Sequence, residues 1–215
     1  MNIYASVAVC FIPLVAVSIC LALLIKGLKV RHILLSALLG LLAVIPIAAL
    51  QMTVDHLAFF SSETLASVLI HSLVINGLIE ESIKMCLLFF LPAKKYDIWK
   101  FLFCAMLSGL ALGCFESVIY LVSGYENIGL RLVTAVMLHT ACAGLGGLFV
   151  WSVRNTKAKL TPFIFAVILH GIYNYFAGFN SGIRWFSLVI ILLAFIECRS
   201  QGLSITEGSG KGENI

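Results

Sequence analysis

The sequence predicts an all-α polytopic membrane protein, a bundle of about seven transmembrane helices. Hydrophobic residues make up 61% of the 215 residues and charged residues only 11%, with a mean hydropathy of +1.09. These values lie outside the range of soluble domains. The apolar residues fall into runs of about 20, the length that crosses roughly 30 Å of hydrocarbon as a helix. The basic residues gather between those runs.

Seven runs have the length and composition of spanning helices. They cover residues 3–25, 33–52, 65–91, 99–122, 131–152, 160–178 and 182–198. We expect residues 1–199 to form one membrane bundle, and the polar, Gly- and Ser-rich residues 200–215 to form a disordered tail. The formal charge of +4 is accounted for by the loops, so the lipid bilayer is an expected partner and nucleic acid is not.

The basic loops predict the orientation. The segments 26–31, 94–100 and 154–159 carry three Lys or Arg residues each, and they alternate with loops that carry few or none. Because basic loops stay cytoplasmic, we expect the N-terminus outside and the tail in the cytoplasm of a plasma or inner cell membrane. The first run, 3–25, lacks a basic leader and an obvious cleavage site, so we interpret it as a retained helix.

The third run contains the segment GLIEESIK, with Glu80, Glu81 and Lys84 in an otherwise apolar helix. Inserting a charge at the centre of a spanning helix costs roughly 2.5 to 3.5 kcal/mol, so we expect these residues to have a structural or functional role. Lys84 is within reach of both carboxylates and can hold one of them. The sequence leaves open which of Glu80 and Glu81 is the general base; because Glu80 shares a face with Asn76 and Lys84, the pattern favours Glu81 as the freer carboxylate.

The fourth run places Glu116 among small residues. Gly109, Gly113, Glu116 and Tyr120 are spaced 4, 3 and 4 apart, which puts them in a stripe about 60° wide on a helix. Small residues on such a stripe let a second helix approach closely. We therefore expect Glu116 to point into the bundle, with Tyr120 in support.

The fifth and sixth runs repeat this pattern. His139, and the pair His170 and Asn174, lie among Ala and Gly residues on one face of their helices. Like Glu116, each His lies about eight residues, or roughly 12 Å, from the expected outer end of its helix. The sequence predicts one intramembrane site that opens toward the outer half of the bilayer, formed by Glu80, Glu81, Glu116, His139, His170 and Asn174.

These residue types suit hydrolysis. A carboxylate in a low-dielectric cavity can share a proton with a neighbouring His and deprotonate water, while a second His and an Asn can bind an oxyanion. No Ser or Cys with a nearby base stands out, which favours water over a covalent nucleophile. Zinc is a candidate cofactor, although the HExxH pattern is absent, and its expected ligands are Glu81, His139 and His170.

Four sequence blocks together resemble the PrsW family of glutamic-type intramembrane proteases, distant relatives of the CAAX prenyl endopeptidases and Abi proteins. They are EESIK (80–84), GLALGCFESVIY (109–120), the stretch 131–139 that leads into MLHTACAGLGG, and HGIYN (170–174). The resemblance covers residues 80–174 and implies a protease core over 65–178. It implies an endopeptidase that cuts a single-pass membrane protein, in better-known members an anti-sigma factor, on its extracytoplasmic side.

The same resemblance assigns residues by position. It implies that Glu80, Glu81 and His139 are needed for activity and that Glu116, His170 and Asn174 complete the site. Ser117 departs from the family pattern, which usually has Asn after the Glu of the second block. The hydrogen bonding around Glu116 is therefore expected to differ.

Two other functions remain open at this point. Buried Glu and His also serve proton-coupled or metal-ion transporters, although the sequence lacks inverted repeats and paired broken helices. A non-catalytic scaffold could bind single-pass partners through its small-residue grooves. The scaffold hypothesis predicts that Glu81→Gln has no effect.

Overall fold

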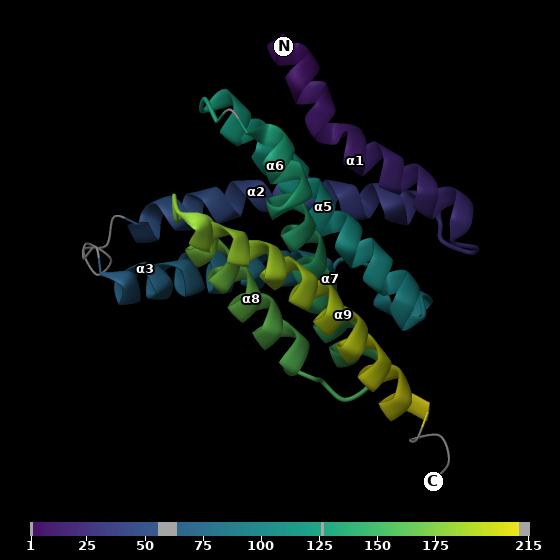
Figure 1. The fold of residues 1–215 in the computed structure, drawn as a ribbon. Helices are drawn as coiled ribbons and strands as arrows, with labels where there is room; N and C mark the ends of the chain where they lie inside the picture. Colours follow the sequence, from purple (N-terminus) through teal and green to yellow (C-terminus); the bar gives the residue numbers. More distant parts are fainter. Residues whose placement is uncertain (1, 56–63, 126, 211–215) are drawn as a thin grey trace.

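The computed structural model describes residues 2–55, 64–125 and 127–210, and within these ranges every regular element is a helix (Figure 1). The elements are α1 (Ile3–Leu24), α2 (Val30–Asp55), α3 (Leu65–His71), the π-helix η2 (Ser72–Ile79), α4 (Glu80–Leu88), the 3₁₀ turn η3 (Ala93–Lys95), α5 (Ile98–Val122), α6 (Ile128–Val133), α7 (Ala135–Asn155), α8 (Thr161–Ala177), the 3₁₀ turn η4 (Gly182–Trp185) and α9 (Phe186–Gly210).

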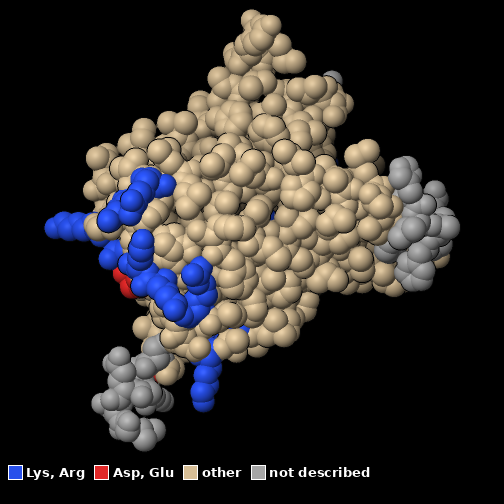
Figure 2. Space-filling view, turned by 180° about the vertical axis from the view of Figure 1, so that it is seen from behind, with Lys and Arg blue, Asp and Glu red and all other residues tan. Residues whose placement is uncertain are grey.

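The apolar helices confirm a multi-pass membrane protein. In the described part of the chain, six helical segments are long and apolar enough to span a bilayer: Ile3–Leu24, Val30–Val54, Leu65–Leu88, Ile98–Val122, Ile128–Asn155 and Gly182–Gly208. The remaining predicted run, 160–178, forms the shorter apolar helix Thr161–Ala177. Lys and Arg side chains gather toward one end of the face shown in Figure 2. The assignment of that end to the cytoplasm stays a prediction.

Helices α5 and α7 form the centre of the bundle, and glycines set their separation. A Cβ atom on Gly109 of α5 would lie 2.1 Å from the carbonyl oxygen of His139 in α7. On the other side of α5, a Cβ on Gly40 of α2 would lie 2.0 Å from the carbonyl oxygen of Ser108. Neither distance is compatible with a side chain, so the backbones meet directly, as the small-residue stripe predicts.

The third predicted run is not a continuous α-helix. Residues 72–79 form the π-helix η2, which lies against α8 through two glycines. A Cβ on Gly77 would lie 2.5 Å from the Val167 carbonyl oxygen, and a Cβ on Gly171 would lie 2.7 Å from the Leu73 Cα. Because a π-helix has more residues per turn than an α-helix, it changes the direction in which Glu80 and Glu81 leave the segment.

The predicted disorder of residues 200–215 is wrong for residues 200–210, which continue α9. Ile205 is buried in the core, and Gly202 approaches the ring of Trp99. Lys159 donates hydrogen bonds to the carbonyl and hydroxyl oxygens of Ser204, at 2.9 and 3.2 Å. Contacts with residues that are distant in the sequence thus stabilise this part of α9 despite its polar composition. Residues 211–215 lie outside the described part of the chain.

We predict that Gly109→Ala lowers stability by about 1–3 kcal/mol, because the added methyl group overpacks the contact between α5 and α7. Gly129→Ala is the matched control, since a Cβ at Gly129 meets no atom within 4 Å. Thermal unfolding of both variants in one detergent tests this. Equal melting temperatures for the two variants would contradict the close backbone contact.

Candidate active site

Five of the six predicted site residues come together in one cluster on α4, α5, α7 and α8: Glu80, Glu81, Glu116, His139 and His170. Glu80, Glu81, Lys84, His139 and His170 are each less than 5% exposed. Glu80 and Glu81 are the first residues of α4, immediately after the π-helix. Charged groups at such depth require partners, and the structure supplies them in two chains of contacts that both end at Glu80.

The first chain runs from Arg131 to Glu80. The Arg131 guanidinium pairs with Oε2 of Glu116 at 2.9 Å, and His139 Nε2 donates to the same oxygen at 2.7 Å. The other ring nitrogen of His139, Nδ1, lies 3.0 Å from Oε1 of Glu80. The cation therefore holds Glu116, and Glu116 orients the imidazole.

The second chain runs from Lys84 to Glu80. The Lys84 ammonium pairs with Oε1 of Glu81, and His170 Nδ1 donates to that oxygen at 2.5 Å. The other ring nitrogen of His170, Nε2, lies 3.9 Å from Oε1 of Glu80. Lys84 also lies 3.6 Å from Glu80, so it compensates both carboxylates of its helix. The two imidazole rings meet edge to face, with centroids 5.0 Å apart.

This arrangement directs acceptor atoms toward one point. Ionised carboxylates only accept hydrogen bonds, so Glu116 and Glu81 place the imidazole protons on the nitrogens that face them. In neutral imidazoles the lone pairs of His139 Nδ1 and His170 Nε2 then face Glu80. Oε1 of Glu80 is buried and accepts no aligned hydrogen bond from a described residue. A proton or a cation between these atoms would relieve the repulsion.

The charge count leads to the same conclusion. Lys84 and Arg131 provide two positive charges against the three negative charges of Glu80, Glu81 and Glu116. With neutral imidazoles, the cluster carries one uncompensated negative charge. Such a charge inside a membrane bundle favours either protonation of an imidazole or the binding of a cation.

A metal ion fits these residues. Donor atoms of Glu80, His139 and His170 lie within 4.8 Å of one another. Two imidazoles and a carboxylate, with further carboxylates oriented onto the imidazoles, form the ligand set and surroundings typical of catalytic zinc. This group shares His139 and His170 with the predicted ligand set and contains Glu80 in place of Glu81. Glu81 is instead committed to Lys84 and His170.

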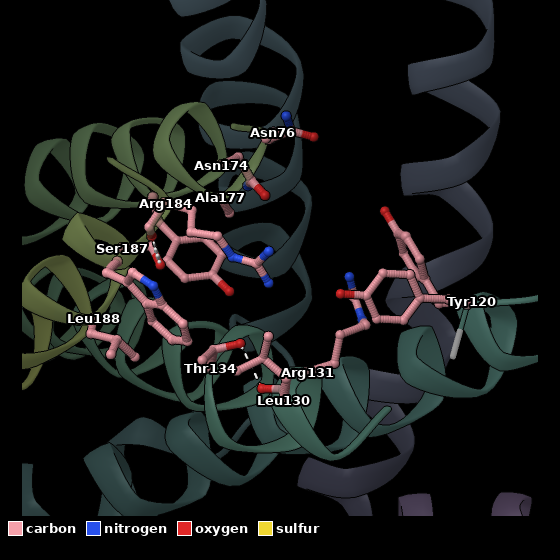
Figure 3. A pocket seen from close by; sticks show the side chains of 14 residues that line it. Asn76, Tyr120, Leu130, Arg131, Thr134, Asn174, Ala177, Arg184, Ser187 and Leu188 are labelled. Atoms are coloured by element: carbon pink, nitrogen blue, oxygen red, sulfur yellow. Dashed lines mark hydrogen bonds between the residues drawn. The ribbon is translucent and has the colours of Figure 1, made fainter. Parts of the chain in front are cut away.

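Two cavities flank the cluster and share Tyr120. The first, which we call the Glu80 cavity, has a volume of about 300 Å³ and is lined by Glu80, Glu116 and apolar residues of α2 and α5. The second, the arginine cavity, has a volume of about 350 Å³ and is lined by Arg131, Arg184 and residues of η2, α5, α6, α8 and α9 (Figure 3). The cluster therefore has space for a ligand on its α2 side.

Three predicted or nearby residues lie around the cluster and not in it. Asn174 donates through Nδ2 to the His170 carbonyl oxygen at 3.3 Å and lines the arginine cavity. Tyr120 lies under the Arg131 guanidinium, whose central carbon is 3.6 Å from the ring centroid. Ser117 donates to the Gly113 carbonyl oxygen, so its hydroxyl does not replace an amide beside Glu116.

Sequence reasoning missed Arg131 as a member of the cluster. The available signal was a guanidinium inside an apolar run, which needs a partner in a membrane protein. Its partner, Glu116, is on the preceding helix. The backbone changes direction at Thr134, between α6 and α7, and this change brings Arg131 to the site. The sequence gives no clear indication of it.

Comparison with known proteins gives one match. A family model described as PrsW family intramembrane metalloprotease matches residues 29–197, which is most of the chain and includes every member of the cluster. No curated protein and no solved structure matches significantly.

We predict that Lys84→Met lowers stability by about 3–5 kcal/mol, because it leaves Glu81 buried without its cation. The double variant Lys84→Met/Glu81→Gln should recover part of that loss. Lys100→Met is the control, since Lys100 pairs with Asp97 on the surface, where such a pair contributes about 0–1 kcal/mol. A Lys84→Met protein that unfolds at the wild-type temperature would contradict the buried pair.

We further predict that the purified chain binds about one zinc ion, and that Glu80→Gln and His139→Ala abolish binding. Glu81→Gln should weaken binding roughly 10- to 100-fold, because Glu81 orients a ligand without being one. Glu207→Gln, an exposed carboxylate of α9, should bind zinc like the wild type. Mass spectrometry of metal content after dialysis measures this, and a wild-type chain without metal would refute the zinc assignment.

Proposed function

The chain belongs to the PrsW family of intramembrane metalloproteases, and from this premise we propose that it hydrolyses a peptide bond in a membrane-anchored, single-pass protein. The observation that supports this most directly is that Oε1 of Glu80 is buried without an aligned hydrogen bond, in a residue that lines a cavity. Two oriented imidazole nitrogens face the same oxygen. This is the arrangement that activation of a water molecule requires.

The side chains have distinct roles in this proposal. Glu80 holds the attacking water, takes its proton, and passes that proton to the amine nitrogen as the C–N bond breaks. His139 or His170, once protonated, donates to the oxyanion that forms when water attacks the scissile carbonyl. Glu81 and Glu116 keep the imidazoles oriented, and Lys84 and Arg131 keep those carboxylates ionised. No covalent intermediate with the enzyme is needed.

The same site accommodates metal assistance. Glu80, His139 and His170 would hold the ion. A divalent metal bound there would supply a Lewis acid that polarises the scissile carbonyl. Glu116 would then be the carboxylate that still faces the Glu80 cavity, since its side chain is 28% exposed. Its Oε1, which the Arg131 and His139 contacts leave unused, is placed to take a proton from water.

The Glu80 cavity suits the end of a transmembrane segment. Its wall contains Val44 and Ile47 of α2 and Leu112 of α5, which form an apolar surface next to two carboxylates. A substrate helix must unwind there, because helical hydrogen bonds occlude its peptide carbonyls. With the predicted orientation, the cut lies on the extracytoplasmic side. We expect the substrate to be a membrane-anchored regulator such as an anti-sigma factor, released by a first, site-1-type cleavage.

The test compares the N-termini of membrane proteins by mass spectrometry in cells that express wild type, Glu80→Gln, His170→Ala or the control Glu207→Gln at matched levels. New termini beside single-pass segments should appear with wild type and Glu207→Gln. They should fall at least about 100-fold with Glu80→Gln, because loss of a general base costs 10²–10⁴ in rate.

Identical termini in all four strains would contradict the proposal. If the variants instead changed proton or ion flux in vesicles, the chain would be a transporter. If no variant changed either quantity, the chain would be a scaffold.

A further inference from the structure

The arginine cavity contains a positive charge that the proposed catalytic cluster does not use. Of its two guanidinium groups, Arg131 is paired with Glu116. Arg184 forms no ion pair with a described carboxylate, and its guanidinium carbon lies 5.4 Å from the ring centroid of Trp185. Figure 3 shows the Arg184 side chain extending into the cavity. A half-buried guanidinium without a counterion favours an anionic ligand.

Hydrogen-bond donors surround that charge. The amides of Asn76 and Asn174 line the cavity, and Asn76 makes no side-chain hydrogen bond to another described residue. No Asp or Glu among the described residues lines it. A planar guanidinium and two amides match a carboxylate, which accepts several hydrogen bonds in one plane. The cavity therefore has the chemistry of a carboxylate-binding site.

The arginine cavity lies next to the catalytic cluster. Asn76 is four residues before Glu80, and Asn174 is four residues after His170. Arg131 contacts Glu116, and Tyr120 lines both cavities. In α8, Asn174 lies about one helical turn of 5.4 Å from His170, close to the distance that two residues cover in an extended peptide. A single extended chain with its scissile bond at Glu80 therefore reaches the arginine cavity within a few residues.

We propose that the arginine cavity is a specificity subsite that binds an Asp or Glu side chain of the substrate, one to three residues from the scissile bond. This inference rests on the proposed protease function. The Glu80 cavity borders on the same residue, Tyr120, which favours a peptide over a lipid phosphate, because an extended peptide can reach both cavities at once. Arg184 is the specificity-determining residue, while Arg131 is shared with Glu116.

The experiment uses full-length protein in phosphatidylcholine nanodiscs and synthetic single-pass peptides. The outer juxtamembrane positions of the peptides carry Glu, Gln or Lys in turn. Fluorescence anisotropy measures their affinity for the Glu80→Gln chain, so that binding is read without cleavage. Mass spectrometry measures their cleavage by chains that keep Glu80.

We expect a Glu peptide to bind roughly tenfold more tightly than its Gln counterpart at one to three positions, because a charge-assisted hydrogen bond is lost in the latter. Arg184→Gln should remove the difference, and Arg184→Glu should favour the Lys peptide. Lys157→Glu, an exposed change of the same charge far along the chain, should leave the preference unchanged. The Arg184 variants should also melt at the wild-type temperature.

The outcomes separate the two proposals. Cleavage by wild type without any preference for Glu, or a preference that survives Arg184→Glu, would overturn the subsite and leave the protease function standing. Arg184-dependent binding of Glu peptides with no cleavage of any peptide would support the site and count against the protease. Tighter binding in phosphatidylglycerol nanodiscs, independent of the peptide residue, would assign the cavity to a lipid phosphate and overturn the subsite.

Discussion

The burial of Glu80 is the constraint on which the rest of this structure depends. Its carboxylate lies beside two oriented imidazole nitrogens in a bundle that a bilayer surrounds, and an isolated charge there would cost several kcal/mol. Two chains of contacts offset that cost, one ending in Lys84 and the other in Arg131. Each chain has the order cation, carboxylate, imidazole. A cluster of this kind fixes the proton positions at the centre and leaves one oxygen for chemistry.

Such short contacts between four helices need backbones that approach closely. Gly109 and Gly113 bring α5 against α7, and Gly77 and Gly171 bring η2 against α8. Side chains larger than hydrogen at these positions would separate the helices that carry Glu116, His139 and His170. Helix packing and the geometry of the cluster are therefore not independent in this bundle, because the positions that allow contact lie within two turns of the groups that meet.

The sequence predicted the fold class, the membrane location and most members of the cluster. It did so where helices are regular, since the stripes on α5, α7 and α8 follow the 3.6-residue period. It failed at the π-helix, where that period does not hold, and so it left open which of Glu80 and Glu81 makes the closer contact with Lys84. Arg131 was missed because a helix break separates it from α7, and the helical end of α9 because its partners, Trp99 and Lys159, are distant in the chain.

The order of the elements along the chain also matters for how the protein is made. The segment Leu65–Leu88 has a hydropathy of 1.3, against 2.9 and 2.7 for the two segments before it, so it is a weak membrane insert. Lys84 lies in the same helix and compensates Glu81 from the start. Glu116, Arg131, His139 and His170 all leave the ribosome later. During biogenesis the GLIEESIK helix must therefore stay in contact with other protein surfaces, or at the bilayer interface, until its partners have been synthesised.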